Sequence, residues 1–151
     1  MYVTARVDYA LRATVELATA DPDLLTAQRV ATSQSISLKL LENILLTLKH
    51  AGIVRARRGY DGGYGLARPA NKITLADVIR AVEGPLANVR GARPESVAYK
   101  GVARPLRDVW IALRVNMRNV LETTTIGDIV ADDLPKTVKN LILKPEAWSP
   151  H

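Results

Sequence analysis

The hydrophobic residues of this 151-residue chain change their period at Gly52, and this change constrains the fold more than any other feature. Before Gly52, apolar residues recur at helical spacing in three segments, which begin after Thr4, near Thr26 and at Ser37. After it, residues 53–57 alternate as a strand, and turn-rich residues lead to a short returning strand that ends at Ala67. Three helices followed by a two-stranded ribbon predict a winged helix-turn-helix, a mainly α fold with a small β-hairpin wing.

The remainder of the chain predicts more helices and a division into three parts. A fourth helix is expected from Thr74 to Gly84, whereas residues 87–105 carry scattered glycine, proline and arginine, which is typical of a loop. Three further helices are expected over about 106–123, 125–130 and 135–144. The division is a winged-helix domain over 1–85, a loop over 86–105, and a long helix with C-terminal helices over 106–151.

The composition excludes several classes of protein. Cysteine is absent, which rules out disulfides, cysteine-built zinc sites and cysteine-ligated iron–sulfur clusters. The two imidazoles, His50 and His151, match no metal-site or catalytic motif, so we expect neither a metal site nor an enzyme. The glycines of residues 59–65 fit no nucleotide-binding spacing. No apolar run could span a membrane and the N-terminus lacks a signal core, so a cytoplasmic protein is expected.

Positive charge is concentrated in the predicted ribbon. The chain has a net charge of +6, and residues 53–68 hold four arginines against the single carboxylate of Asp61. A basic element on an otherwise balanced domain is typical of binding to nucleic acid or another polyanion. A solvated charged face is the alternative interpretation of the charge alone.

The outward face of the third predicted helix carries side chains that can read bases. Its polar residues offer the donors and acceptors that contact base edges in a major groove, although Glu42 would repel phosphate. An ordinary solvent face is the alternative. The glycines of the ribbon permit close backbone approach. The candidate DNA-binding residues of helix and ribbon are Ser37, Lys39, Leu40, Asn43, Thr47, Arg55, Arg57, Arg58, Gly62 and Gly63.

The long predicted helix carries more apolar surface than a small winged domain needs. Packing it against a second copy would bury this surface and hold two DNA-reading helices at a fixed spacing. Burial against the last helix of the same chain is the alternative. The candidate dimerisation residues are Leu106, Val109, Trp110, Leu113, Met117 and Val120.

Several motifs together resemble one family, the Rrf-two winged-helix transcription regulators, which include the IscR, NsrR and CymR types. The most specific motif is the ribbon pattern Arg58-Gly59, Gly62-Gly63-Tyr64 and Leu66-Ala67, and the resemblance covers about residues 1–130. It implies a homodimer that binds operator DNA, with the third helix in the major groove and the wing in the minor groove. By position, Ser37, Lys39, Leu40 and Asn43 match the reading face and Arg58 matches the wing arginine.

The chain departs from the family where many members bind a cluster. Residues 87–105 lack the three cysteines, and the first helix has Asp8 and Arg12 where other members use an acidic residue and a histidine. We therefore expect no cofactor. The sequence predicts a homodimeric, sequence-specific regulator, expected to be a repressor, that binds double-stranded operator DNA. The alternative is a winged-helix interaction or ligand-sensing module that does not read DNA, and Tyr9, Arg12 and Trp110 are the candidate effector residues.

Overall fold

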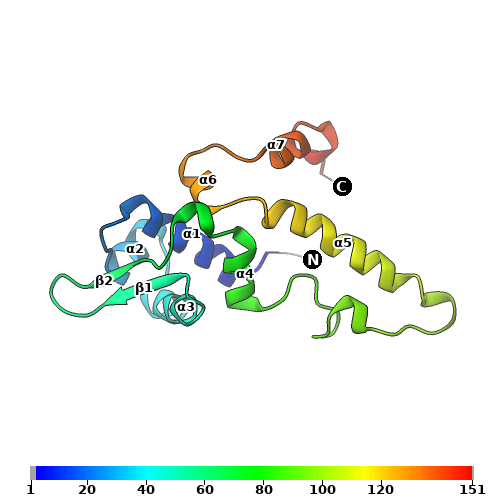
Figure 1. The fold of residues 1–151 in the computed structure, drawn as a ribbon, viewed down its shortest axis with the longest axis horizontal. Helices are drawn as coiled ribbons and strands as arrows, with labels where there is room; N and C mark the ends of the chain where they lie inside the picture. The colour runs from blue at the N-terminus through cyan, green and yellow to red at the C-terminus, as the bar shows by residue number, and fades with distance from the viewer. Residues whose placement is uncertain (1–2, 151) are drawn as a thin grey trace.

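The computed structural model describes residues 3–150, so His151 lies outside the described residues. A winged-helix domain occupies one end of an elongated molecule, and a long helix extends away from it (Figure 1). This arrangement confirms the predicted fold class. The helices and strands are α1 (Ala5–Ala20), α2 (Ala27–Gln34), α3 (Leu38–His50), β1 (Val54–Arg57), β2 (Gly63–Leu66), α4 (Leu75–Glu83), α5 (Leu106–Leu121), α6 (Ile126–Val130) and α7 (Lys136–Ile142).

Threonine hydroxyls begin four of the helices, as their positions predicted. The side chains of Thr4 and Thr26 accept hydrogen bonds from main-chain N–H groups of the first turns of α1 and α2. Thr74 and Thr125 do the same for α4 and α6. In these two helices the carboxylate of the aspartate three residues later also accepts a hydrogen bond from the N-cap N–H. Ser37 occupies the N-cap of α3, but its side chain makes no capping hydrogen bond.

The turn between α2 and α3 depends on a residue in the left-handed conformation. Ser35 has φ 53° and ψ 47°, a backbone region that glycine enters most easily. Ile36 follows with 5% of its surface exposed, and its N–H donates to the carbonyl of Ala31 at 2.9 Å. This buried isoleucine fixes the angle at which α3 leaves the turn.

The core lies between α1, α3 and α4. The inward residues Leu41, Ile44, Leu45 and Leu48 of α3 are fully buried, as the helical spacing predicted. They pack with residues of α1, including Leu17, in one continuous hydrophobic cluster. The opposite face of α3 therefore points away from the core.

The β-hairpin is antiparallel, with Val54 opposite Leu66 and Arg57 opposite Gly63. The sequence predicted this pair but not its third partner. The main chain of Leu25, before α2, exchanges two hydrogen bonds with Tyr64, at 2.9 and 2.7 Å. The base of the wing is thus held on its second edge by the segment that leads into α2.

The chain returns to the winged-helix core after α5. Ile126 of α6 has no exposed surface and belongs to the main hydrophobic cluster. The Thr74–Thr125 bridge and a hydrogen bond from the N–H of Leu75 to the carbonyl of Thr124, at 3.0 Å, hold this segment in place. Residues 124–130 therefore pack as part of the winged-helix domain, because Ile126 completes its core.

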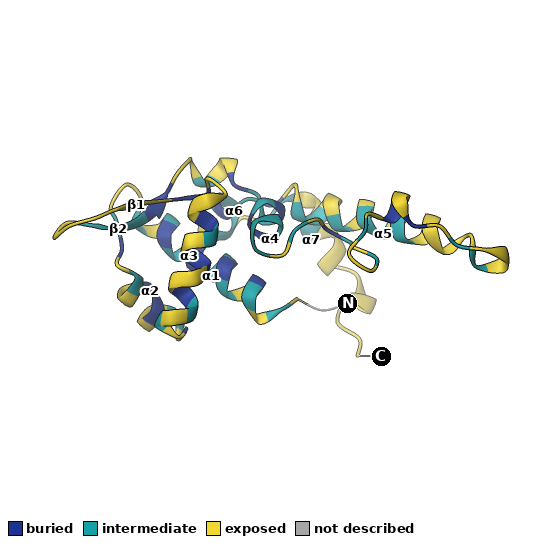
Figure 2. Cartoon of the chain, turned by 90° about the horizontal axis from the view of Figure 1, so that it is seen from below, coloured by how far each residue is buried: buried dark blue, intermediate teal, exposed yellow. Residues whose placement is uncertain are grey.

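The long helix α5 has no buried residue along its 16 positions. Figure 2 shows it as alternating exposed and intermediate segments, whereas α1 and α3 carry buried ones. Residues 86–105, expected as a loop, contain two short 3-10 turns, Pro94–Ser96 and Gly101–Ala103, and an isolated bridge between Val89 and Ala92. Among residues 3–150, no helix is long and apolar enough to cross a membrane.

Candidate nucleic-acid interface

The outward face of α3 presents polar side chains with little internal engagement. Ser37, Lys39 and Asn43 are exposed and Leu40 is half-buried. The Asn43 amide nitrogen donates to the carbonyl of Lys39 at 3.1 Å, a bond within its own helix turn. The amide oxygen of Asn43 has no partner in the described part of the chain, so this side chain can reorient toward a base edge.

Thr47 is the member of this predicted set that the structure places differently. Its hydroxyl accepts a hydrogen bond from the Arg6 guanidinium at 3.1 Å and donates one to the carbonyl of Asn43 at 3.0 Å. Both bonding functions of the hydroxyl are therefore used within the protein. The Arg6 side chain, which the sequence did not single out, reaches from α1 to α3 at this point and adds a positive charge beside Thr47.

The three hairpin arginines have different partners, which their spacing could not show. Arg55 donates to the carbonyl oxygens of Leu66 and Pro22 at 2.9 and 3.0 Å, so it holds the base of the hairpin. Arg57 donates to the carbonyl of Asp61 at 2.6 Å, across the turn of the hairpin. The Arg58 side chain has no hydrogen bond or ion pair with any residue between 3 and 150.

An open groove separates α3 from the hairpin. Its lining includes Leu46 and Lys49 of α3 together with Arg58 and Gly59 of the hairpin turn. Leu46 is 49% exposed although its neighbours Leu45 and Leu48 are buried. The sequence did not single it out as a surface residue, because it lies in a run of leucines typical of a core. Tyr60, at the hairpin tip, is fully exposed. The cation of Arg58 thus faces the same groove as Leu46 and Lys49 of α3.

Gly62 and Gly63 serve the protein's own packing. A Cβ atom at Gly63 would lie 2.7 Å from the carbonyl oxygen of Leu25, and one at Gly62 would lie 2.3 Å from that of Arg57. Both positions therefore exclude larger residues because of contacts within the chain, independently of any contact with DNA. These two residues shape the turn that presents Arg58, and their close approach is to the backbone of the chain itself.

The candidate effector residues are not gathered into one pocket within the chain. Arg12 donates to the side chain of Gln34, at 3.1 Å, and to its main-chain carbonyl, which joins α1 to the end of α2. Its guanidinium also lies 5.5 Å from the ring centroid of Tyr9. Trp110 donates instead to the hydroxyl of Tyr99 at 2.9 Å, and lines a separate small pocket with Leu113 and residues 87–90.

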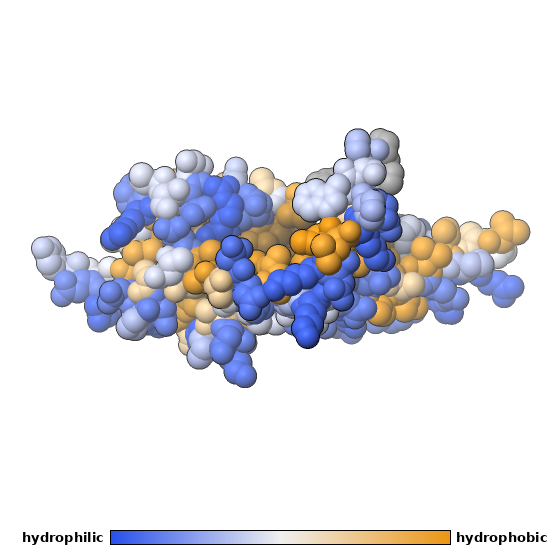
Figure 3. Space-filling model, turned by 90° about the horizontal axis from the view of Figure 1, so that it is seen from above, coloured by the Kyte–Doolittle hydropathy of each residue, from blue (hydrophilic) through white to orange (hydrophobic). Residues whose placement is uncertain are grey.

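The apolar stripe of α5 is only partly covered by the described residues. Leu106 and Val109 are 42% and 54% exposed, while Trp110, Leu113, Met117 and Val120 are intermediate. The last α-helix, α7, contacts α5 but has no buried residue itself, and Leu141 and Ile142 on it and Leu143 just after it are exposed. Figure 3 shows hydrophobic surface along the half of the molecule that holds α5 and α7.

The described residues do not fit a metal or an iron–sulfur cluster. The chain contains no cysteine, and His50, at the end of α3, is exposed. Within residues 3–150 no three histidine or carboxylate side chains converge on a point where a metal ion could be held. Asp8 pairs with Arg12 at 3.2 Å, so its carboxylate already has a cationic partner.

Comparison with known proteins agrees with the geometry of this surface. The family model of the Rrf2 (Rrf-two) iron-dependent transcriptional regulators matches residues 3–132. The helix-turn-helix transcriptional regulator Rv1287 of Mycobacterium tuberculosis is 43% identical over 142 residues, which span 93% of this chain and 88% of that protein. CymR of Bacillus subtilis is 31% identical over 132 residues, with 87% of this chain and 91% of CymR covered.

Solved structures give the same result. The crystal structure of the B. subtilis CymR, the global cysteine regulator of that organism, superposes with a TM-score of 0.73 at 29% identity and covers 87% of this chain and 97% of CymR. The IscR structure of T. potens has a TM-score of 0.69 at 25% identity and covers 100% of this chain and 93% of IscR. These relatives are regulators of transcription and not enzymes. The chain therefore belongs to the Rrf2 family of DNA-binding, helix-turn-helix transcriptional regulators.

Proposed function

We propose that the protein is a cytoplasmic, homodimeric repressor that binds a palindromic operator without a metal or cluster cofactor. The observation that carries this proposal is that Arg58, which has no partner among the described residues, lines a groove together with Lys49 of α3, the helix whose outward face is polar and exposed. A helix of this kind fits the major groove, and a hairpin beside it reaches the adjoining groove.

The roles of the two elements differ. Asn43 and Lys39 project from α3, where an asparagine can contact adenine with two hydrogen bonds and a lysine can contact guanine or phosphate. Arg58 lies on a hairpin that approaches a narrow groove, where negative potential attracts arginine. In this proposal α3 reads the sequence, and the hairpin positions the protein on the duplex.

Dimerisation is supported by the partly uncovered stripe of α5. A 16-residue helix with no buried position and three exposed large apolar residues, of which Leu106 and Val109 belong to the stripe, would gain its missing burial from the same stripe of a second copy. Two copies related by a two-fold axis would present their α3 helices to successive major grooves, about 34 Å apart. The operator would then be an imperfect palindrome.

The test compares Arg58→Ala and Asn43→Ala on operator and scrambled DNA, at several salt concentrations. The operator is first obtained by selecting bound fragments from genomic DNA. Removing Arg58 should weaken binding to both DNAs and reduce the salt slope by about one unit. Removing Asn43 should cost roughly 1–3 kcal/mol of discrimination at one base position per half-site and leave the salt slope unchanged.

Arg104→Ala is the matched control, because Arg104 is exposed and belongs to the segment just before α5, which lies at the end of the molecule opposite the hairpin (Figure 1). It should behave as the wild type. If Arg58→Ala also binds both DNAs as the wild type does, the hairpin does not contact DNA and the interaction-module alternative is favoured. Equal weakening of both DNAs by Asn43→Ala would show that α3 positions the protein without reading bases.

A further inference from the structure

A positively charged pocket lies where α4, the 86–105 loop and α5 meet, away from the α3 surface. It has a volume of about 420 Å³, within the range of small-ligand sites. Gly84, Pro85 and Leu86 form part of its wall. Four arginines and one carboxylate complete the lining: Arg80, Arg93, Arg114, Arg118 and Glu95.

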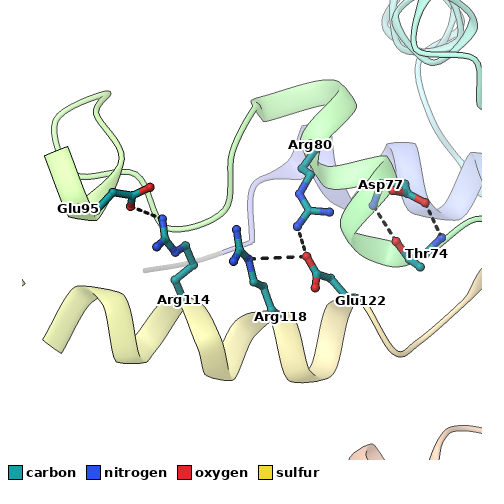
Figure 4. A network of polar contacts seen from close by, with 7 residues as sticks. All are labelled: Thr74, Asp77, Arg80, Glu95, Arg114, Arg118 and Glu122. Carbon is teal, nitrogen blue, oxygen red and sulfur yellow. Dashed lines mark hydrogen bonds and ion pairs between the residues drawn. The ribbon is translucent and has the colours of Figure 1, made fainter. Parts of the chain in front are cut away.

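The carboxylates at this site are too few for its cations. Figure 4 shows Arg114 directed at Glu95, while Arg80 from α4 and Arg118 from α5 both reach Glu122. Arg93 is exposed and has no side-chain hydrogen bond or ion pair among the described residues. Two carboxylates thus face four guanidinium groups, which leaves an excess charge of +2 even when Glu122 is included.

The positive charge of Arg114 is only partly neutralised, although this arginine is the least exposed partner among the ion pairs of the pocket. Its side chain is only 14% exposed, and its Nε is buried without a hydrogen-bond partner. Its one ionic partner among the described residues, Glu95, is 47% exposed, so solvent weakens that pair. A buried cation is destabilising unless opposite charge and hydrogen bonds surround it. An additional anion in the pocket would supply both.

We propose that this pocket binds a small di- or trianion through carboxylate or phosphate oxygens, and that binding changes the affinity for operator DNA. Guanidinium groups bind such oxygens in pairs of parallel hydrogen bonds. The bound anion would compete with Glu122 for Arg80 on α4. Because α4 packs against both α1 and α3, this exchange reaches the DNA-reading helix. The effect on DNA affinity rests on the proposed function, whereas the binding site itself does not.

Thermal unfolding of the full chain without DNA tests the site. Citrate and pyrophosphate are added separately, with sodium chloride at matched ionic strength as the reference. Each ligand that binds should raise the unfolding midpoint saturably, by roughly 5–10 °C at 100 times its Kd. The tighter of the two ligands shows whether carboxylate or phosphate oxygens are preferred.

Arg93→Gln and Arg114→Gln should abolish this shift. Arg107→Gln, on α5 like Arg114, should keep the shift, because Arg107 is exposed and pairs with its neighbour Asp108 outside the pocket. Arg93 has no internal partner to lose, so its variant tests the site even if Arg114→Gln unfolds. The proposal is overturned if neither anion shifts the midpoint beyond chloride, or if Arg93→Gln shifts as the wild type does.

Operator titrations separate the effect on DNA from the site. Citrate or pyrophosphate should change the operator affinity of the wild type at least threefold relative to Arg93→Gln at the same ionic strength. An equal response of the two proteins would overturn the effect on DNA affinity. A reduced salt slope in Arg93→Gln, without any anion-dependent shift, would instead identify Arg93 as a DNA phosphate contact. Failure of the wild type to bind operator at all would concern the proposed function alone.

Discussion

The main-chain N–H of Ile126 donates a hydrogen bond to the carbonyl oxygen of Ile73, 2.8 Å away, and both side chains are fully buried. The two residues are 53 positions apart in the chain, and the whole of α5 lies between them. This contact closes the chain back onto the winged-helix domain. The C-terminal end of the long helix is consequently joined to the core that also supports α3.

Replacement of Ile126 by alanine should destabilise the whole winged-helix domain. Removing three methyl or methylene groups from a fully buried site costs about 2–5 kcal/mol of unfolding free energy. Ile142→Ala provides the control, because Ile142 is 42% exposed on α7 and its truncation should cost less than about 0.5 kcal/mol. Urea unfolding at one protein concentration measures both. Equal effects of the two variants would contradict the placement of α6 in the core.

A charge on the stripe of α5 should break the dimer. Val109→Asp or Leu113→Asp would place a carboxylate in a desolvated apolar contact, which is strongly unfavourable. We expect a monomer in sedimentation equilibrium at micromolar concentration and loss of tight operator binding. Val102→Asp is the matched control, since Val102 is fully exposed before α5 begins. A wild-type protein that is itself monomeric would refute the assembly.

Enlarging Gly63 should displace the hairpin. The added Cβ of Gly63→Ala would meet the carbonyl oxygen of Leu25 at 2.7 Å, so the hairpin must move away from the segment before α2. Binding should weaken on operator and scrambled DNA alike, together with a loss of thermal stability. Gly59→Ala meets no atom within 4 Å and carries only the backbone penalty of φ +107°, so it should be the milder change. The reverse order would show that the hairpin is not held by Leu25.

The ion pair between Glu95 and Arg114 should respond to acid. The hydrogen bond from its own main chain and the one from Arg114 lower the pKa of the Glu95 carboxyl below its usual 4.5. A lowered pKa in the folded state stabilises the protein above the unfolded pKa, and this stabilisation disappears as the pH falls through the folded value. The difference in unfolding midpoint between the wild type and Glu95→Gln should therefore be constant above about pH 5.5 and shrink below pH 4.5. A difference that grows on acidification would contradict the pairing.

The purified protein should be colourless and should bind its operator without added metal. No cysteine is present, and the described histidine and carboxylate side chains do not converge on a metal site. Anaerobic purification followed by iron analysis and visible absorption spectroscopy provides the measurement. Stoichiometric iron with visible absorbance would show that oxygen or nitrogen ligands bind a metal, and Asp8 would be the first residue to replace.

Local rules in the sequence were sufficient for most of the secondary structure. Threonine capping positions predicted the starts of α1, α2, α4 and α6, and the leucine spacing predicted the buried face of α3. These features depend on residues within one or two turns of one another. The change of period at Gly52, where φ is +72°, likewise located the end of α3 and the start of the hairpin.

Contacts between distant segments could not be predicted in this way. The hydrogen bonds from Arg55 to the carbonyls of Leu66 and Pro22 depend on how these segments pack in three dimensions. The same holds for the hydrogen bond from Arg6 to Thr47. The burial of Ile126 could not be predicted either, since a five-residue helix is too short to show which of its faces is apolar. The arginines of the α4–α5 pocket are scattered between positions 80 and 118, and no motif joins them.

The short connection between α5 and Ile126 has a consequence for the DNA sites that the proposed dimer accepts. Inserting one base pair between two half-sites increases their separation by about 3.4 Å and rotates one relative to the other by roughly 35° about the duplex axis. A long flexible tether would absorb such a change, but only residues 122–125 separate the end of α5 from the buried segment. The proposed dimer would therefore accept only one spacing of the two half-sites, and operators with one base pair added or removed at the centre should be rejected even when both half-sites are perfect.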